Sequence, residues 1–190
     1  MSNIFFTSDN HFYHTNIIKY SNRPFVDVED MHEQMIQKWN AVVGQDDIVY
    51  NLGDFSFGKI ENTIKILKRL NGRQHFIFGN HDKELIRNKD VLIQDGYFES
   101  MDYYKEIKVE GQHINLFHFG CRVWNKSHHS AWLLFGHSHG SLPPHGKSVD
   151  IGSDSPWING QAEYRPFTFT EVKRFMDKQE VTYVDHHEER

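Results

Sequence analysis

The chain has 190 residues, with 21 Lys and Arg against 26 Asp and Glu, a formal net charge of -5, and 14 His beside a single cysteine. The lone Cys121 excludes a disulfide framework and a thiolate zinc cluster, and the net acidity argues against long nucleic acid as a partner. The apolar start Ile4-Phe5-Phe6 is too short for a signal peptide, and no run approaches the roughly 18 apolar residues of a membrane span. We therefore expect a cytoplasmic protein with no membrane partner.

The first half of the chain alternates predicted strands and helices. We expect strands over residues 3–8, 47–52 and 74–78, a helix over 28–43, and a second helix on which Ile60, Ile64 and Leu67 share a face. Asp27 is the expected N-cap of the first helix, and Gly72 ends the second. This order is typical of an α/β protein.

The second half changes character. Strands over 105–109 and 112–118 flank Glu110-Gly111, a two-residue hairpin signal, and apolar runs follow at 132–135 and, more weakly, at 148–151. A helix over 170–178 and a closing strand over 181–184 complete the chain. Because no linker or repeat divides it, we predict one domain over residues 1–190, with two packed mixed β-sheets flanked by helices.

Polar residues follow the predicted strands where each strand ends. Five strands are followed by residues of metal-ligand type: Asp9 and His11, Asp54, Asn80-His81-Asp82, His118, and His137-Ser138-His139. In α/β sheets this edge is where ligands bind. Each motif alone is common in turns, so the ordered set carries the prediction.

The chemistry of this set predicts two divalent metal ions. Carboxylates, an amide oxygen and imidazoles suit Mn, Fe, Zn, Ni or Co, with Mn favoured here, rather than Cu(I) or an iron–sulfur cluster. A carboxylate can bridge two cations because it has two oxygens. Glycines precede Asp54, Asn80 and His137, and we expect them to let the backbone turn and leave room for the ions.

The motifs resemble those of the calcineurin-like metallophosphoesterases. That family's pattern of D-x-H, G-D, G-N-H-D/E, a lone H and G-H-x-H is matched in order over residues 9–139. The segments 22–25 and 123–125 are similar to a small phage and bacterial subgroup. Gly120, where many relatives carry Pro, and residues 143–165 depart from the pattern, and both could reshape the substrate rim.

The resemblance implies a four-layer αββα architecture and a role for each motif residue. It implies that the first metal is held by Asp9, His11 and His139, the second by Asn80, His118 and His137, with Asp54 as the bridge. It further implies that His81 is a catalytic group that assists the leaving oxygen, with Asp82 steadying its imidazole.

The implied reaction is hydrolysis of a phosphate ester by a hydroxide bound between the two metal ions. The ions outweigh the two carboxylates and the hydroxide, so an acidic chain can still attract an anionic ester. A small phosphodiester or nucleotide-type substrate is slightly preferred to a monoester. The alternatives are a phosphomonoesterase or protein phosphatase, a non-catalytic metal-binding scaffold, and a nuclease subunit. The sequence does not set the oligomeric state.

Four further residues are candidates for substrate binding: Arg122, His14, Trp124 and Arg23. An arginine can grip a phosphate through two parallel hydrogen bonds, and we favour Arg122 because it follows His118 closely. Trp124 belongs to the segment 122–132. This segment could form a rim on which a base stacks, or it could be a loop whose tryptophans pack in the core. His14, three residues after His11, could act beside the site or lie on the surface.

Overall fold

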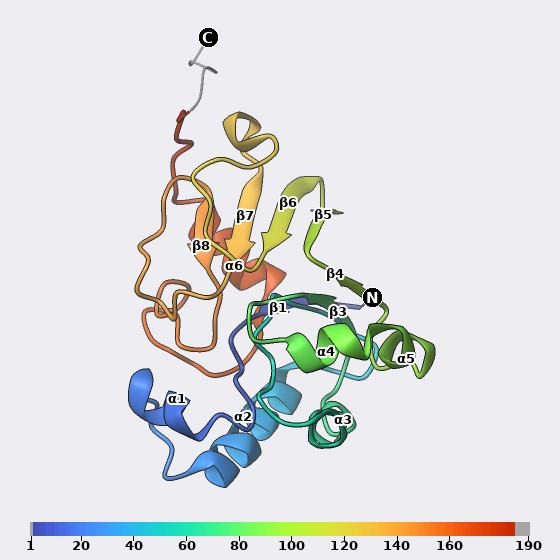
Figure 1. Cartoon of the computed structure of the whole chain (residues 1–190). Coiled ribbons are helices and arrows are strands. Elements are labelled where there is room, and N and C mark those ends of the chain that lie inside the picture. Colours follow the sequence, from blue (N-terminus) through green and yellow to red (C-terminus); the bar gives the residue numbers. More distant parts are fainter. Residues whose placement is uncertain (1, 185–190) are drawn as a thin grey trace.

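The computed structural model describes residues 2–184, and it contains two β-sheets that face one another (Figure 1). The first sheet has the strand order β4-β3-β2-β1-β9, and the second has the order β5-β6-β7-β8. The strands of the first sheet are β1 (Ile4–Thr7), β2 (Ile48–Asn51), β3 (Arg73–Ile77), β4 (Ser100–Asp102) and β9 (Phe167–Thr168). Those of the second are β5 (Tyr104–Val109), β6 (Gln112–Phe117), β7 (Trp132–Phe135) and β8 (Ser148–Asp150).

Both sheets are mixed. Strands β1 to β4 run parallel and β9 pairs antiparallel with β1, while β6, β7 and β8 run parallel and β5 joins β6 as an antiparallel hairpin. A parallel bridge between Ser8 and Gly152 connects the segments that leave β1 and β8. The carboxyl ends of the parallel strands in the two sheets therefore meet at one edge of the sandwich.

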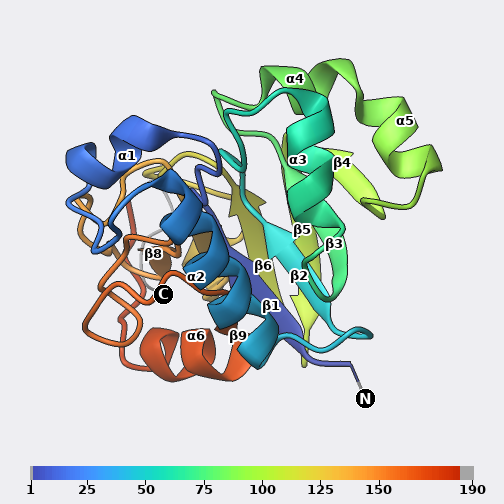
Figure 2. The ribbon, with the colours of Figure 1, turned by 90° about the horizontal axis from the view of Figure 1, so that it is seen from below.

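The helices lie around this sandwich (Figure 2). They are α1 (Thr15–Tyr20), α2 (Val28–Val42), α3 (Ile60–Leu67), α4 (Lys83–Arg87), α5 (Lys89–Gln94) and α6 (Phe169–Met176), with a 3₁₀ turn, η1, at Ser127–His129. The predicted architecture of two packed mixed sheets with flanking helices is confirmed. Within residues 2–184, no helix is both long and apolar enough to cross a bilayer.

Two apolar cores hold the layers together because successive side chains of a strand point to opposite faces. Phe5 packs with the buried side of α2, including Met35 and Trp39, on the outer face of the first sheet. Phe6 points the other way and packs between the sheets with Leu134 and with Val172 of α6. Helix α6 therefore contributes to the core between the sheets.

Local signals fix several element boundaries, and two of them, at Asp27 and at Glu110-Gly111, agree with the prediction. Asp27 caps α2, its carboxylate accepting a hydrogen bond from the Asp30 backbone N–H at 2.8 Å. The hairpin residues Glu110 and Gly111 have φ of 48° and 87°, as a two-residue type I′ turn requires. Helix α6 begins with a capping box between Thr168 and Glu171.

The predicted closing strand over 181–184 is wrong, because that segment has no strand partner. The edge beside β1 is taken instead by β9, where Phe167 pairs with Phe6. Strand β9 has two residues, which is too short for alternation to predict it. The short elements α1, α4, α5 and β4 were likewise not predicted from sequence.

The core between the sheets should dominate stability. We expect Leu134→Ala to lower the free energy of unfolding by about 2–5 kcal/mol, because Leu134 is fully buried and its loss leaves a cavity between the sheets. The control Val26→Ala, at a side chain that is 90% exposed, should change it by less than about 0.5 kcal/mol. Urea unfolding followed by circular dichroism measures both, and equal midpoints for the two variants would contradict this packing.

Candidate metal centre

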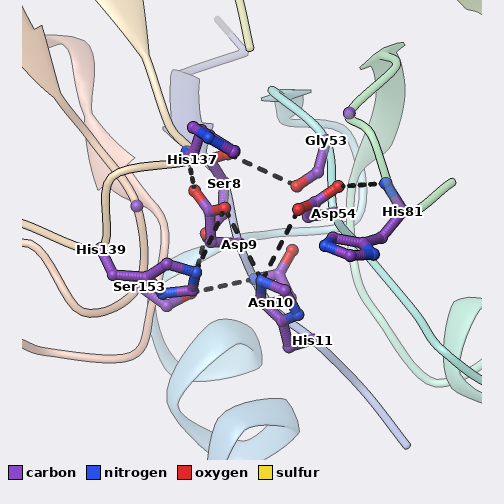
Figure 3. A network of polar contacts seen from close by, with 12 residues as sticks. Ser8, Asp9, Asn10, His11, Gly53, Asp54, His81, His137, His139 and Ser153 are labelled. Atoms are coloured by element: carbon purple, nitrogen blue, oxygen red, sulfur yellow. Dashed lines mark hydrogen bonds and ion pairs between the residues drawn. The ribbon is translucent and has the colours of Figure 1, made fainter. Parts of the chain in front are cut away.

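Six of the seven predicted ligands form two adjacent groups at the shared edge of the sheets. The first group is Asp9, His11 and His139, and the second is Asp54, His118 and His137, with the candidate ligand atoms of each group within 4.8 Å of one another. The seventh, Asn80, places its Oδ1 3.1 Å from His118 Nε2. Asp54 also lies against the first group, with its Oδ2 3.8 Å from His11 Nε2, which is the place a bridging carboxylate would occupy (Figure 3).

The backbone is left-handed at five of these residues. Asp9, His11 and Asp54 have φ of 55°, 55° and 52°, and His137 and His139 have φ of 67° and 48°. Residues other than glycine seldom adopt this conformation, and such strain gathers at functional sites. The strand ends thus turn sharply so that the side chains converge on one point.

Hydrogen bonds between loops hold this strained backbone. Asp9 N–H donates to the Gly53 carbonyl at 2.9 Å, and His11 N–H donates to the Asp54 carbonyl at 3.0 Å. His137 N–H donates to Asp9 Oδ2 at 2.9 Å, which ties the second sheet to the first. The loops after β1, β2 and β7 therefore position one another.

The glycines of the motifs make room for the carboxylates. A Cβ at Gly79 would lie 2.3 Å from Asp54 Oδ1, and one at Gly136 would lie 2.0 Å from Ser8 Oγ and 2.3 Å from Asp9 Oδ2. Gly53 also needs its positive φ of 98°. The expected role in turning the backbone holds for Gly53, whereas Gly79 and Gly136 leave space for the side chains beside them.

The donor set fits divalent cations. Asp9 Oδ1 and His11 Nε2 are buried atoms with no hydrogen-bond partner in the described chain, which is costly unless something else satisfies them. Three histidines anchor their other ring nitrogen: His11 Nδ1 to His14 Nδ1 at 3.3 Å, His139 Nδ1 to Asp154 Oδ2 at 2.7 Å, and His118 Nδ1 to the Leu52 carbonyl at 2.7 Å. Each of these rings thus has Nε2 available toward the cluster, the arrangement found around metal-bound histidines.

The electrostatics favour positive charge at this point. Burial raises the pKa of the Asp9 carboxyl, but the contact with His11, 3.7 Å from Asp9 Oδ1 to His11 Nε2, and the other nearby histidines outweigh burial and hold that pKa well below its usual range. Burial lowers the pKa of His118, while its contact with Asp54 and the charge of Asp9 raise it to about 9. The cluster therefore favours ionised carboxylates together with a positive charge beside them.

Asp82 does not have the predicted role. Its carboxylate accepts hydrogen bonds from three backbone N–H groups, at Gly79 (2.7 Å), Asp54 (2.8 Å) and Phe55 (3.0 Å), and within residues 2–184 none joins it to the His81 ring. Burial dominates and raises its pKa to about 6. Asp82 therefore fastens the loops after β2 and β3 together, because it is buried beneath them, while His81 is exposed.

Arg23, a candidate substrate contact from the sequence, is buried instead. Its guanidinium contacts both oxygens of Asp154, at 2.9 and 2.7 Å, and donates to the carbonyls of Asn10 (2.9 Å) and Asp9 (2.7 Å). With its donors turned inward, Arg23 supports the loop that carries Asp9. This corrects the expectation that it binds substrate.

His14 lies beside the first group. Its ring stacks on Phe57, with centroids 4.0 Å apart, while its Nδ1 faces His11 Nδ1. Burial and the neighbouring His11 lower the pKa of His14 to about 4, so the ring is neutral at neutral pH. Of the two sequence interpretations, the geometry favours a position beside the site, where His14 orients His11.

The segment 122–132 follows β6 and packs by its tryptophans. Trp124 is half-buried, its indole N–H donating to the Ala131 carbonyl at 2.8 Å, and Trp132 is buried. This geometry matches the packed-loop interpretation for Trp124. Arg122 is exposed, and no hydrogen bond or ion pair engages it within the part of the chain that the structure describes.

Two residues of the site were missed from sequence, Asp154 and Phe57. Asp154 follows β8, so the same rule that found the other motifs, a polar residue after a strand, would have found it. Phe57 gave no sequence signal. It is 39% exposed, and its ring centroid lies 4.7 Å from that of His81 and 5.2 Å from that of His11.

The contact between His14 and His11 yields a test. We expect His14→Phe, which keeps an aromatic ring for Phe57 but removes the nitrogen that faces His11, to weaken divalent-metal binding about 10- to 100-fold. Calorimetric titration of chelator-stripped protein with Mn²⁺ or Zn²⁺ measures the affinity. The control His113→Phe, in β6, should bind metal as the wild type does; unchanged affinity in His14→Phe would contradict the orienting role.

No family model matches the chain. An uncharacterized protein of Methanocaldococcus jannaschii is 32% identical over 190 residues, covering 95% of this chain and 95% of that protein. The Gene 66 protein of Mycobacterium phage L5 is 31% identical over 184 residues, covering 82% of this chain and 88% of its own length.

Solved structures share the fold. A protein of unknown function from Aquifex aeolicus superimposes with a TM-score of 0.66 at 25% identity, covering 92% of this chain and 99% of its own. A novel archaeal phosphodiesterase does so with a TM-score of 0.50 at 19% identity, covering 88% and 99%. The chain therefore belongs to one family with the Methanocaldococcus jannaschii and phage L5 proteins, and its fold and the order of its motifs resemble those of the calcineurin-like metallophosphoesterases.

Proposed function

We propose that the protein is a metal-dependent phosphoesterase that hydrolyses a small phosphate ester, with a phosphodiester or nucleotide-type substrate preferred to a monoester. The observation that carries this proposal is the pair of adjacent ligand groups with Asp54 against both, in which Asp9 Oδ1 and His11 Nε2 are buried without partners. Such a pair matches what an in-line displacement at phosphorus needs.

Seven residues would hold two divalent ions, with Mn favoured: Asp9, His11 and His139 for one, Asn80, His118 and His137 for the other, and Asp54 for both. When bound, the ions would polarise the phosphoryl oxygens and lower the pKa of a water between them. Hydrogen bonds to His14, Asp154 and the Leu52 carbonyl keep the ligand rings oriented, so little reorganisation is needed.

In this proposal, His81 acts on the leaving group. Its backbone N–H donates to Asp54 Oδ1 at 2.9 Å, which fixes it beside the cluster, while its side chain is exposed and makes no hydrogen bond within residues 2–184. A ring that is near the site but free can donate a proton to a departing oxygen. Phe57 next to it offers an apolar face to an organic leaving group.

The direct test is a screen of the purified protein with mono- and bis-nitrophenyl phosphate under Mn, Ni and Zn. We expect turnover that is lost on exhaustive chelation and returns when metal is added back. Activity that survives complete removal of metal would overturn the metal-dependent mechanism. Failure with every metal would favour a non-catalytic scaffold.

Asp54→Ala should abolish stoichiometric metal binding together with activity, because Asp54 lies against both ligand groups. Elemental analysis of the purified variant and the nitrophenyl assay measure the two effects. Asp177→Ala, which removes an exposed carboxylate of an α6 ion pair, is the control and should keep both. An Asp54→Ala protein that retains two metals would rule out the bridging role.

His81→Ala should behave differently. We expect it to keep its metal content and to lose about 10²–10⁴-fold in kcat for esters with poor leaving groups, with a smaller loss for nitrophenyl esters, which need little protonation. Comparing phenyl with nitrophenyl esters measures this dependence. Loss of metal in the variant would show that His81 is a ligand.

A further inference from the structure

A cavity of about 360 Å³ is lined in part by residues at and after the ends of β6 and β7, the two strands that lead to His118 and His137. Its walls are mainly apolar, with Phe135, Leu142, Pro143 and Pro144, and Arg122 is the one charged arginine or lysine among its lining residues. The volume falls in the range of small-molecule sites, and apolar walls with a few polar groups are their usual composition.

The cavity adjoins the ligand groups through the chain itself. Gly120 lies two residues after His118, and Phe135 lies two residues before His137, so the Cα atoms of these two lining residues lie within about 7 Å of a ligand's Cα. The ring centroid of Phe119 lies 4.8 Å from the ring centroids of both His118 and His137. A substrate whose phosphate occupies the site could extend a group over Phe119 toward the cavity.

Of Arg23, Arg122 and Arg165, only Arg122 has its guanidinium available within residues 2–184. Arg23 is held by Asp154, and Arg165 is held by Glu163 and Glu171. Arg122 has no such partner among residues 2–184. A cationic side chain without a partner at an apolar cavity is suited to a ligand that carries an anionic or acceptor group.

Both departures from the family pattern line this one cavity. Gly120 forms part of its wall, where a Cβ would lie 2.7 Å from Leu142 Cδ2 and 3.1 Å from Phe135 Cε2. Pro143, Pro144, His145 and Ser148 belong to the segment 143–165. The absence of a side chain at Gly120 lets Leu142 and Phe135 pack close to the backbone there, so Gly120 helps to shape this wall of the cavity.

We propose that this cavity binds the retained ester group of a phosphodiester, with a nucleoside-sized ring between its apolar walls and an acceptor of that group on Arg122. The proposal rests on the proposed function, and it selects diesters over monoesters. In an in-line displacement the leaving group departs on the His81 side, so the retained group is free to extend toward the walls formed by the β6 and β7 loops.

The test uses two esters with the same leaving group, p-nitrophenyl thymidine 5′-phosphate and methyl p-nitrophenyl phosphate. Only the retained group differs, so the ratio of their kcat/KM values isolates the cavity. We expect the wild type to favour the thymidine ester at least tenfold. Arg122→Met and Gly120→Val should each reduce that preference about tenfold or more, because the loss falls mainly on the thymidine ester.

Controls separate this proposal from the proposed function. Arg174→Met, at an exposed arginine of α6, should leave the ratio unchanged, and all variants should keep their metal content. A wild-type ratio near one, or a ratio that neither cavity variant lowers, would overturn the subsite. If neither ester is hydrolysed, the proposed function fails. The subsite is then tested by calorimetric titration with thymidine 5′-monophosphate. Equal Kd values for the wild type and Arg122→Met would overturn the subsite as well.

Discussion

The structure depends on two carboxylates, Asp9 and Asp54, buried beside one another where the two sheets meet. Burying like charges together is unfavourable unless cations compensate them. His118, with its raised pKa, supplies part of that charge, yet Asp9 Oδ1 still lacks a partner within residues 2–184. Divalent ions, as in the proposed phosphoesterase, would compensate these charges, whereas without a cation the two buried carboxylates would be costly.

The surrounding loops are organised to hold those carboxylates in place. Asp82 accepts hydrogen bonds from backbone N–H groups of two loops, and Arg23, paired with Asp154, donates to the backbone carbonyls of Asp9 and Asn10. These contacts support a left-handed backbone at the ligands, which would otherwise relax. Arg23 and Asp82, which the sequence analysis assigned to substrate binding and catalysis, thus stabilise the loops instead. A strained backbone needs such additional hydrogen bonds to hold its conformation.

The sequence predicted most of what depends on short-range pattern. Strands β1, β2 and β3 could be placed because apolar runs end in glycine or polar residues, and the ligands followed from their position after those strands. The prediction of a closing strand over residues 181–184 was wrong because the segment that pairs with a sheet edge depends on tertiary packing. In this chain the two-residue strand β9 pairs there with β1. The partnership of Arg23 with Asp154 joins residues 131 positions apart, and no local pattern reports such a contact.

Each ligand group draws on both sheets. Asp9 and His11 follow β1 of the first sheet while His139 follows β7 of the second, and Asp54 faces His118 and His137 in the same way. An ion in either group would therefore be a cross-link that closes a loop of more than a hundred residues between His11 and His139, or of about sixty between Asp54 and His118. Binding of metal ions would then restrain the sliding of one sheet over the other. The ions proposed for catalysis would therefore also stabilise the packing of the two sheets.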